Sequence, residues 1–234
     1  MASQILLFIL FLMNPGFSDA QQEPKKGAIL KLEGKVINAE SQLPINVKTT
    51  ITYETLPHGN DVGVTNVAPS SSYEFYLRKS NSYKVQAKAS GYLAMSRILE
   101  PGSYNKDDLT LNFELKPVKI GDILKYENLQ FDQGKAMITT EASYDLEDLM
   151  ATMFMNPGME IRIEGHTDYS GNPKLNLELS EKRVKEVKYF LIDRGIDKSR
   201  IDTEAFGESR PLVTSGTLEE RSVNRRVEIR VTSM

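Results

Sequence analysis

The sequence predicts a multidomain fold, an N-terminal all-β sandwich followed by a C-terminal α+β domain whose helices pack on one face of a mixed sheet. In the first half, short apolar and β-branched runs alternate with turn residues, and no helical stripe of about ten residues appears. After about residue 120 the pattern changes to strands that alternate with long amphipathic segments. A chain of 234 residues is long enough for both domains.

We expect a signal peptide at residues 1–20, a linker at 21–27, the sandwich at 28–116 and the α+β domain at 117–234. Residues 5–13 form an unbroken apolar run of nine, well short of the about twenty residues that cross a membrane. Small residues at 18–20 suit cleavage after Ala20. The segment before the run lacks Lys and Arg, so a short membrane anchor is the alternative. On the first reading the mature chain begins near Gln21 and has no transmembrane segment.

The composition excludes several functions. A net charge of −3 gives no general attraction to nucleic acid or to anionic membranes. The absence of cysteine excludes disulfides, lipidation on cysteine and thiol catalysis. Because the only histidines are His58 and His166, a zinc site built from nitrogen and sulfur ligands is not expected. We therefore expect no cofactor, no metal and no nucleic-acid partner.

Five runs in residues 28–116 are expected to form strands of the sandwich. Apolar and β-branched residues dominate each run, and turn residues such as Pro57 and Gly102 separate them. The runs are ILKLEGKVI (29–37), INVKTTITYE (45–54), YEFYLRK (73–79), YKVQAKA (83–89) and LTLNFEL (109–115). Five to seven short strands suit a small sandwich with one core.

This half resembles the carboxypeptidase-regulatory-like domains, which share a transthyretin-like fold. The segment GKVINAESQLPI (34–45) looks like the opening of that family, and YKVQAKASGY (83–92) resembles its penultimate strand and the turn after it. The family's central Thr-Asp-x-x-Gly turn is missing, because this chain has TNVAPSSSYEF (65–75) instead. The resemblance covers about ninety residues and implies a non-catalytic spacer or binding module.

The first strand and the first helix of the C-terminal half are expected between residues 129 and 158. Leu129 and Phe131 alternate with polar residues, as in a strand with one buried face. Thr140 is placed to cap the helix that follows, and the Asn-Pro-Gly sequence at 156–158 ends it. The apolar residues of this helix fall at helical spacing, and they are Leu146, Leu149, Met150, Met153 and Phe154.

Three strands and a second helix complete the expected order β-α-β-α-β-β. Residues 159–164 alternate apolar and charged side chains, which predicts a strand with one solvent-exposed face. After the loop GHTDYSG (165–171), Asn172 and Pro173 suit the N-cap and first turn of a helix that runs to about residue 194. Residues 201–206 and 224–231 are expected to form the last two strands.

One residue of the second helix does not fit a buried stripe. Leu175, Leu179, Val187 and Leu191 repeat in steps of four, and Arg183 falls where the next apolar residue belongs. Read alone, a guanidinium at this position is more often a structural ion pair with a neighbouring carboxylate. The alternative is that the stripe passes under a groove bordered by the GHTD loop.

The same half resembles the OmpA-like C-terminal domain, the peptidoglycan-binding module of diderm bacteria. The resemblance covers about 110 residues. Its motifs are FDxG at 131–134, NP at 156–157, GHTD at 165–168, LSxxR at 179–183 and NRRVE at 224–228. Val184 departs from the pattern, because the family usually has alanine there.

In that family an aspartate and an arginine hold the diaminopimelate of the peptidoglycan stem peptide, and they match Asp168 and Arg183. A carboxylate accepts from an ammonium and a guanidinium clamps a carboxylate, so the two together read a zwitterionic centre. Asn176 lies two turns before Arg183 on the same helix face. Strand parity turns Arg225 toward the helices and Arg226 away, which favours Arg225. The candidate ligand-binding residues are Asp168, Arg183, Asn176, Arg225, Thr167, Gly171 and Asp132.

Several loop residues also have structural interpretations. His166 shares its loop with an aspartate and a serine, but a catalytic triad needs a defined spatial order and an oxyanion hole. We therefore expect a hydrogen-bonded structural histidine and no catalytic residue. Thr167 and Gly171 also suit turn positions, and Asp132 also suits a cap at a strand end. Glu208 is expected to brace a loop.

The sequence thus predicts a secreted protein of the periplasm, associated with the cell wall and with the inner face of the outer membrane. It is expected to bind peptidoglycan non-covalently through diaminopimelate and not to be an enzyme. The alternative is a structural subunit of a cell-envelope or secretion complex, with other envelope proteins bound to the sandwich. A hydrolase would need a carboxylate pair or a metal, and the sequence shows no cluster of metal ligands.

Overall fold

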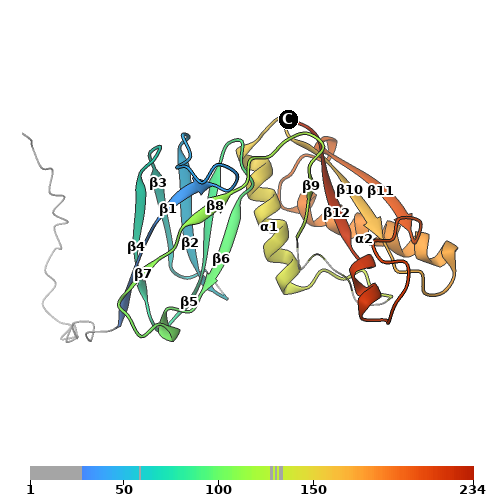
Figure 1. The fold of residues 1–234 in the computed structure, drawn as a ribbon, viewed down its shortest axis with the longest axis horizontal. Coiled ribbons are helices and arrows are strands. Elements are labelled where there is room, and N and C mark those ends of the chain that lie inside the picture. The colour runs from blue at the N-terminus through green and yellow to red at the C-terminus, as the bar shows by residue number, and fades with distance from the viewer. Residues whose placement is uncertain (1–27, 58, 127–128, 130, 132–133) are drawn as a thin grey trace, which may run out of the picture.

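The computed structural model describes residues 28–57, 59–126, 129, 131 and 134–234. The expected signal peptide, the linker and Asp132 lie outside the described residues. Figure 1 shows an N-terminal unit made of strands beside a C-terminal unit that combines strands with two long helices. Within the described part of the chain, no helix is both long and apolar enough to cross a membrane.

The N-terminal unit consists of two four-stranded sheets that share one hydrophobic core. Its strands are β1 (Ile29–Asn38), β2 (Thr49–Leu56), β3 (Val62–Val67), β4 (Ser72–Arg78), β5 (Ser82–Ala89), β6 (Met95–Leu99), β7 (Asp108–Thr110) and β8 (Phe113–Leu115). One sheet has the order β4-β1-β7, with β8 also paired to β1, and the other has the order β3-β2-β5-β6. The β-rich N-terminal half is confirmed, although β3 and β6 are not among the strands that the sequence pattern predicts.

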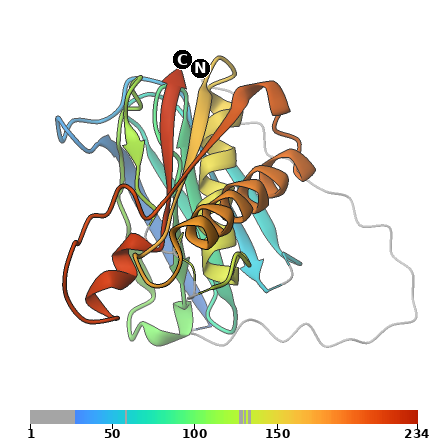
Figure 2. The ribbon, with the colours of Figure 1, turned by 90° about the vertical axis from the view of Figure 1, so that its right-hand side faces the viewer.

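The C-terminal unit packs two helices on a mixed sheet. Its elements are β9 (Ile123–Leu124), α1 (Thr140–Met155), β10 (Glu160–His166), α2 (Pro173–Asp193), β11 (Ile201–Gly207) and β12 (Val227–Ser233). The sheet order is β11-β10-β12-β9, parallel between β10 and β11 and antiparallel elsewhere. Ile161 and Ile163 of β10 share a core with Leu149 of α1 and Val187 of α2. In Figure 2, α2 crosses in front of α1.

Three short 3-10 helices lie in the connections, at Pro101–Ser103, Lys198–Arg200 and Glu220–Asn224. The last of them directly precedes the segment that leads into β12. Asn224 in this turn is fully buried and holds the preceding loop, because its side chain accepts hydrogen bonds from the N–H groups of Leu212 (2.7 Å) and Val213 (3.0 Å). These two hydrogen bonds fix the backbone of the loop before β12.

The structure corrects several local expectations. Leu129 and Phe131 are buried but are not assigned to a strand, although they bond to the segment before β12, from Val227 N to Leu129 O at 3.3 Å and from Phe131 N to Arg225 O at 3.1 Å. The side chain of Thr139 caps α1, one residue earlier than expected. Phe154 and Leu175, which the periodicity places in apolar stripes, are 56% and 62% exposed. Both lie in terminal turns of their helices, where the pattern continues but burial does not.

The two units meet where α1 packs against β5 and β6. Side chains at every fourth residue along one face of α1, ending at its C-cap residue, accept hydrogen bonds from backbone N–H groups in β6 and the segment before it. These bonds run from Ser96 N to Asp148 Oδ2 (2.8 Å), from Ala94 N to Thr152 Oγ1 (2.8 Å) and from Gly91 N to Asn156 Oδ1 (2.7 Å). We call this row the α1 ladder. It takes the place of a further strand beside β6.

Ionic and amide contacts extend the same junction onto β5. Lys84 is almost fully buried and pairs with Glu147 of α1. The side chain of Gln86 donates to Asp148 Oδ1 at 2.7 Å. Because these polar groups are paired across the junction, separating the two units would leave several of them without their partners.

Candidate binding site

A pocket of about 260 Å³ lies at the N-terminal end of α2. Its lining comes from two loops, from α2 and from the segment before β12, and consists of Gly134, Thr167, Asp168, Ser170, Gly171, Asn172, Leu175, Asn176, Leu179, Arg183 and Arg225. Six of the seven residues proposed from the sequence are among them. The seventh, Asp132, lies outside the described residues. The structure therefore brings the described candidates together around one pocket.

The loop between β10 and α2 is shaped by local backbone chemistry. Gly171 has φ +97°, a left-handed conformation that favours glycine. Asn172 then caps α2, because its side-chain oxygen accepts from the N–H groups of Lys174 (2.8 Å) and Leu175 (3.4 Å). Pro173 occupies the first turn of the helix, where its missing N–H has no cost. The cap and the glycine together fix where the loop meets the helix.

The close approach of α2 to β10 depends on Gly165. A Cβ atom at this position would lie 2.7 Å from the carbonyl oxygen of Ser180 and 2.7 Å from a methyl group of Val184. Val184 is itself buried, so the residue that departs from the family pattern packs directly against the glycine. The hydroxyl of Ser180 accepts from the N–H of Gly207 at 3.0 Å. The middle of α2 is therefore fixed against both β10 and β11, which sets the position of Arg183.

Asp168 is the acidic group of the pocket and is almost fully buried. Its Oδ2 atom pairs with Nη1 of Arg225 at 3.1 Å, and its Oδ1 atom accepts from the N–H of Ser170 at 3.0 Å. Burial alone would raise the pKa of this carboxyl group. The hydrogen bonds from Ser170 and Arg225 outweigh burial, and the pKa lies below its ordinary value. Asp168 is therefore ionised at neutral pH.

Arg183 is fully buried at the floor of the pocket. Its Nε atom donates to the carbonyl oxygen of Lys135 at 3.0 Å and its Nη1 atom donates to that of His166 at 2.9 Å. The guanidinium also lies over the ring of Phe131, 5.0 Å from its centre. Burial, followed by the charge of Arg225, lowers the pKa of Arg183 to about 10, so the group is still a cation at neutral pH.

The structure separates two roles that the sequence left open for Arg183. Asp168 forms its ion pair with Arg225, the arginine before β12. Arg183 instead ties the segment before α1 to the end of β10 through two carbonyl oxygens. It combines a structural function with a position in the pocket wall.

Asn176 and Arg225 complete the polar lining. The side-chain amide of Asn176 donates to the carbonyl oxygen of Ser170 at 3.2 Å and to Glu208 Oε2 at 2.5 Å. Glu208 thus braces this loop, as the sequence suggested. Arg225 reaches toward the helices, where its Nε atom also donates to the carbonyl oxygen of Phe131 at 3.3 Å. Arg226 instead pairs with Glu228 at 2.7 Å.

The apolar part of the pocket wall was not predicted. The helical periodicity places Leu175 and Leu179 in a core stripe, yet both line the pocket, and Leu175 is largely exposed. A signal was present in the sequence, because both lie on the same row of the helix as Arg183. Residues on the same face of a helix point in the same direction, so a charged residue that faces a pocket indicates that its neighbours on that face also point toward the pocket. The site therefore offers one carboxylate and two guanidiniums beside an apolar wall.

His166 differs from its expected role. It is buried and stacks on Phe206, with ring centres 5.4 Å apart, but neither of its ring nitrogens hydrogen-bonds to a described residue. The expectation of a hydrogen-bonded histidine is therefore wrong, because the ring is held by stacking. Burial and the nearby charge of Arg226 lower the pKa of His166 to about 4. The residue is neutral at physiological pH and makes no triad with Ser170 or Asp168.

The outer face of the same sheet carries one described group of potential metal ligands, Glu164, His166 and Glu228, with ligand atoms within 4.8 Å of one another. Both carboxylates are already ion-paired, Glu164 with Arg230 at 2.6 Å and Glu228 with Arg226 at 2.7 Å. A divalent cation would have to sit between two guanidiniums and compete with them. The arrangement fits an ion-pair network better than a metal site.

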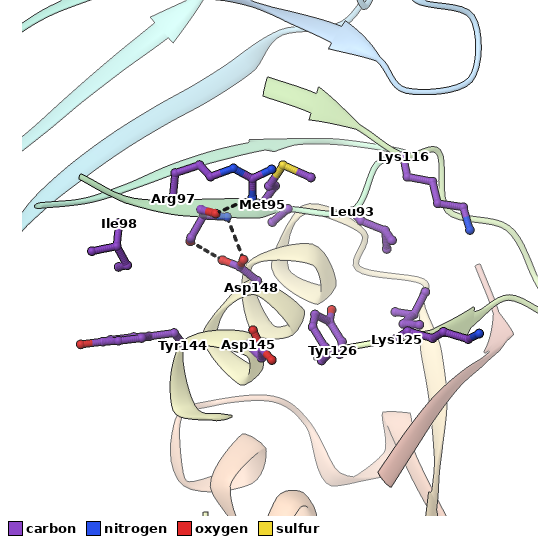
Figure 3. A pocket seen from close by; sticks show the side chains of 13 residues that line it. Leu93, Met95, Arg97, Ile98, Lys116, Lys125, Tyr126, Tyr144, Asp145 and Asp148 are labelled. Atoms are coloured by element: carbon purple, nitrogen blue, oxygen red, sulfur yellow. Dashed lines mark hydrogen bonds between the residues drawn. The ribbon is translucent and has the colours of Figure 1, made fainter. Parts of the chain in front are cut away.

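A larger cavity of about 590 Å³ lies between the two units, beside β6 and α1. In its lining, Asp148 of α1 is hydrogen-bonded to Ser96 of β6, and Figure 3 shows Tyr144 and Tyr126 on either side of Asp148. Both oxygens of Asp148 are engaged in the contacts that join the units. The charged residues proposed from the sequence lie in the smaller pocket, which combines opposite charges with an apolar wall. We therefore assign the candidate site to the smaller pocket.

Comparison with known proteins matches residues 130–225 to the OmpA family. Outer membrane porin F of Pseudomonas fluorescens is 34% identical over 113 residues, which are 48% of this chain and 35% of that protein. The peptidoglycan-associated lipoprotein of Haemophilus influenzae is 31% identical over 102 residues, which are 44% of this chain and 67% of that protein. The solved peptidoglycan-associated lipoprotein of Burkholderia pseudomallei has 21% identity and a TM-score of 0.42, over 45% of this chain and 88% of that one. The chain spans about a third of the porin's length.

Proposed function

The chain belongs to the OmpA family, and from this premise we propose that its C-terminal unit binds peptidoglycan non-covalently and anchors an envelope protein or complex to the cell wall. One relative is named a peptidoglycan-associated lipoprotein, and others are named outer membrane proteins. These names support a location in the cell envelope. We place the protein in the periplasm, at the cell wall and near the inner face of the outer membrane.

The observation that carries the choice of ligand is the charge arrangement of the pocket. Asp168 can accept from an ammonium group, while Arg225 and Arg183 can each bind a carboxylate. The free end of diaminopimelate presents an ammonium and a carboxylate on one carbon atom. A ligand with only one of these two groups can contact only one sign of the pocket's charge, so it gains less affinity than the zwitterion. The apolar wall suits the methylene chain between the two ends of diaminopimelate.

The same residues favour binding without catalysis. Hydrolysis of the glycan would need a pair of carboxyl groups, one as an acid and one as a base or nucleophile. Asp168 is the only acidic residue among those that line the pocket in the described part of the chain. Its lowered pKa also keeps it ionised and unable to donate a proton at neutral pH. We therefore assign the pocket a binding role.

A second candidate function rests on the N-terminal unit. It contributes no residue to the pocket, although it has a hydrophobic core of its own and a polar junction with α1. We therefore assign the N-terminal unit a role separate from the pocket. Its resemblance to carboxypeptidase-regulatory-like domains implies a non-catalytic binding module. On this proposal the protein is a structural subunit of an envelope complex, with the C-terminal unit as its anchor.

Co-sedimentation with purified sacculi tests the proposal. The chain from Gln21 onward should sediment with sacculi, free diaminopimelate should compete, and no muropeptides should be released. Asp168→Asn should sediment poorly, whereas Glu228→Gln, which alters a carboxylate away from the pocket, should sediment like the parent. Release of muropeptides would overturn the assignment as a non-enzyme. Sedimentation that free diaminopimelate leaves unchanged would overturn the choice of ligand.

A further inference from the structure

Strand β3 forms one outer edge of its sheet. It pairs with β2 from Thr49↔Val67 to Glu54↔Val62, and no other described strand pairs with it. The far side of β3 therefore presents backbone N–H and C=O groups that the sheet leaves available. Such an edge is a template for another strand, and natural proteins usually protect it.

Other edges of the same unit are protected. The edge of β6 is covered by the α1 ladder, whose side chains accept from the N–H groups of Ser96 and Ala94. The edge strand β4 carries charge on its outward face, where Glu74 forms an ion pair with Lys31 at 2.9 Å and Arg78 follows. Both are recognised ways of preventing edge-to-edge pairing.

Strand β3 has neither form of protection. Its sequence VGVTNV contains no charged residue and no proline. Val62 and Val64 point outward and are each 64% exposed, so the strand offers apolar side chains together with its backbone groups. The ring of Tyr53 lies against Gly63, where a Cβ atom would come within 2.2 Å of it, so the strand is packed in place. A well-packed, uncharged edge strand can pair with a strand of another chain.

We propose that β3 pairs antiparallel with β3 of a second copy of this chain, so that the two sheets join into one. The strand fits its own copy, because an uncharged strand meets no like charge when it pairs with itself. The register that centres the strand on a two-fold axis places Val64 opposite Val64 of the partner subunit. Val62 then lies opposite Asn66, and Gly63 lies opposite Thr65, so outward residues meet outward residues. This contact is isologous and closes at two copies.

The position of β3 gives the dimer a function. In the sheet order β3-β2-β5-β6, the C-terminal unit packs against β5 and β6, while β3 is the opposite edge (Figure 1). A dimer joined through β3 therefore holds its two C-terminal units apart at its ends. Two wall-binding pockets on one dimer bind the multivalent sacculus with avidity, without any new contact to the ligand. This consequence rests on the proposed function, whereas the dimer itself does not.

The first test measures association. The chain from Gln21 onward should sediment at twice the monomer mass at about 100 µM, a range in which weak self-association is detected. Val64→Lys should be monomeric, because a charge at the two-fold axis meets its own copy. Tyr76→Lys on β4, also an exposed side chain on an edge strand, should remain dimeric. A parent protein that is monomeric at this concentration, or a Tyr76→Lys variant as monomeric as Val64→Lys, would overturn the proposal.

The second test uses the absence of cysteine in this chain. Val64→Cys should form a disulfide-linked dimer under mild oxidation, because directly opposed Cβ atoms lie about 5 Å apart. Val62→Cys is the matched control, since Val62 has the same 64% exposure on the same strand. In this register the two introduced thiols at Val62 lie about 13 Å apart, too far for a bond. Equal cross-linking of the two variants would rule out the proposed pairing.

The third test separates the dimer from the pocket. Val64→Lys should bind sacculi at least about tenfold more weakly than the parent, because avidity is lost, while its affinity for free diaminopimelate is unchanged. Equal binding to sacculi would contradict the bivalent role. If neither protein bound sacculi, the proposed function would fail, whereas the association and cross-linking results would still decide whether the dimer exists.

Discussion

At the scale of single residues, Asp168 is the sharpest probe of the pocket. Asp168→Asn keeps the size of the side chain but removes the counter-charge for a ligand ammonium and for Arg225. We expect the affinity for diaminopimelate to fall by about 2–5 kcal/mol, the range for breaking one partner of a buried charged pair. Calorimetric titration of the parent, Asp168→Asn and Glu228→Gln would check it. Unchanged affinity of Asp168→Asn would remove the aspartate from the site.

Arg183 is expected to affect folding as well as binding. If Arg183 only faced a binding groove, Arg183→Ala would leave the domain folded and even stabilise it, because a cation would leave an apolar stripe. The structure reverses this expectation, because the guanidinium satisfies two carbonyl oxygens, those of Lys135 and His166. Removing it should lower the free energy of unfolding by about 1–3 kcal/mol for each acceptor left buried without a partner. Urea denaturation of Arg183→Ala measures this.

A conservative variant then separates the two roles of Arg183. Arg183→Lys keeps the charge but cannot reproduce a planar donor group that reaches two carbonyl oxygens and a ligand. We expect Arg183→Lys to recover part of the lost stability and little of the lost affinity for diaminopimelate. Full recovery of both stability and affinity would show that any cation suffices at this position. That result would contradict a two-bond contact between the guanidinium and a ligand carboxylate.

His166 gives the molecule a defined response to acid. Its pKa is about 4 in the folded protein and about 6.5 in an unfolded chain, so the unfolded state takes up the proton first as the pH falls. Stability should therefore be complete above about pH 6.5 and decline toward pH 4, by at most about 3 kcal/mol. The lowered pKa values of Asp168 and Glu164 make their contribution below about pH 4.5.

The histidine variant isolates this contribution. His166→Gln cannot titrate, so its free energy of unfolding should change much less between pH 6.5 and 4.5 than that of the parent. Urea denaturation at a series of pH values would measure both curves. Parallel curves for the two proteins would show that His166 is not the group responsible.

At the scale of elements, the sequence predicts well where the pattern is long and regular. The end of α1 and the start of α2 follow from Asn172, Pro173 and the Asn-Pro-Gly stop, because these signals are local. Strand β3 was not predicted, since its alternation includes glycine and asparagine and has no clear apolar face. The pairing of Leu129 and Phe131 with the segment before β12 is not predicted, because that partner is far away in sequence.

The pocket shows the same division. The charged residues were found through short motifs, and the structure brings the described ones together. The pairing of Asp168 with Arg225 in preference to Arg183 depends on how the segment before β12 packs, which no local pattern encodes. Leu175 and Leu179 were misassigned to the core for a related reason. Helical periodicity gives the face on which a residue lies, but not how far the facing layer extends along the helix.

The α1 ladder can be tested by a nearly isosteric substitution. Thr152→Val keeps the shape of the side chain but removes the oxygen that accepts from Ala94 N at 2.8 Å. We expect the free energy of unfolding to fall by about 1–3 kcal/mol, because this N–H is left buried without a partner. Ser143→Ala on the same helix is the control, since its hydroxyl bonds only within the helix, to Thr140 O. Equal decreases in the free energy of unfolding for the two variants would show that the α1 ladder does not stabilise the protein more than a bond within the helix.

At the scale of the whole molecule, the C-terminal unit holds the binding pocket, and the junction between the two units contributes to stability. Every described residue that lines the pocket belongs to the C-terminal unit, and none of them is in α1 or in the α1 ladder. Cutting the chain before residue 117 would expose the acceptors of Asp148, Thr152 and Asn156 to water but leave the pocket residues in place. Water can satisfy these acceptors, at the cost of the contacts they make with the N-terminal unit.

We therefore expect residues 117–234 alone to bind free diaminopimelate with the affinity of the full chain but to melt at a lower temperature. Binding to sacculi should be weaker than that of the full chain, because the fragment lacks β3 and so loses the bivalent contact proposed above. Thermal melting, diaminopimelate titration and sacculus sedimentation of the same fragment would distinguish these contributions. A folded fragment that fails to bind diaminopimelate would show that the pocket depends on the N-terminal unit, since its own lining residues would all be present.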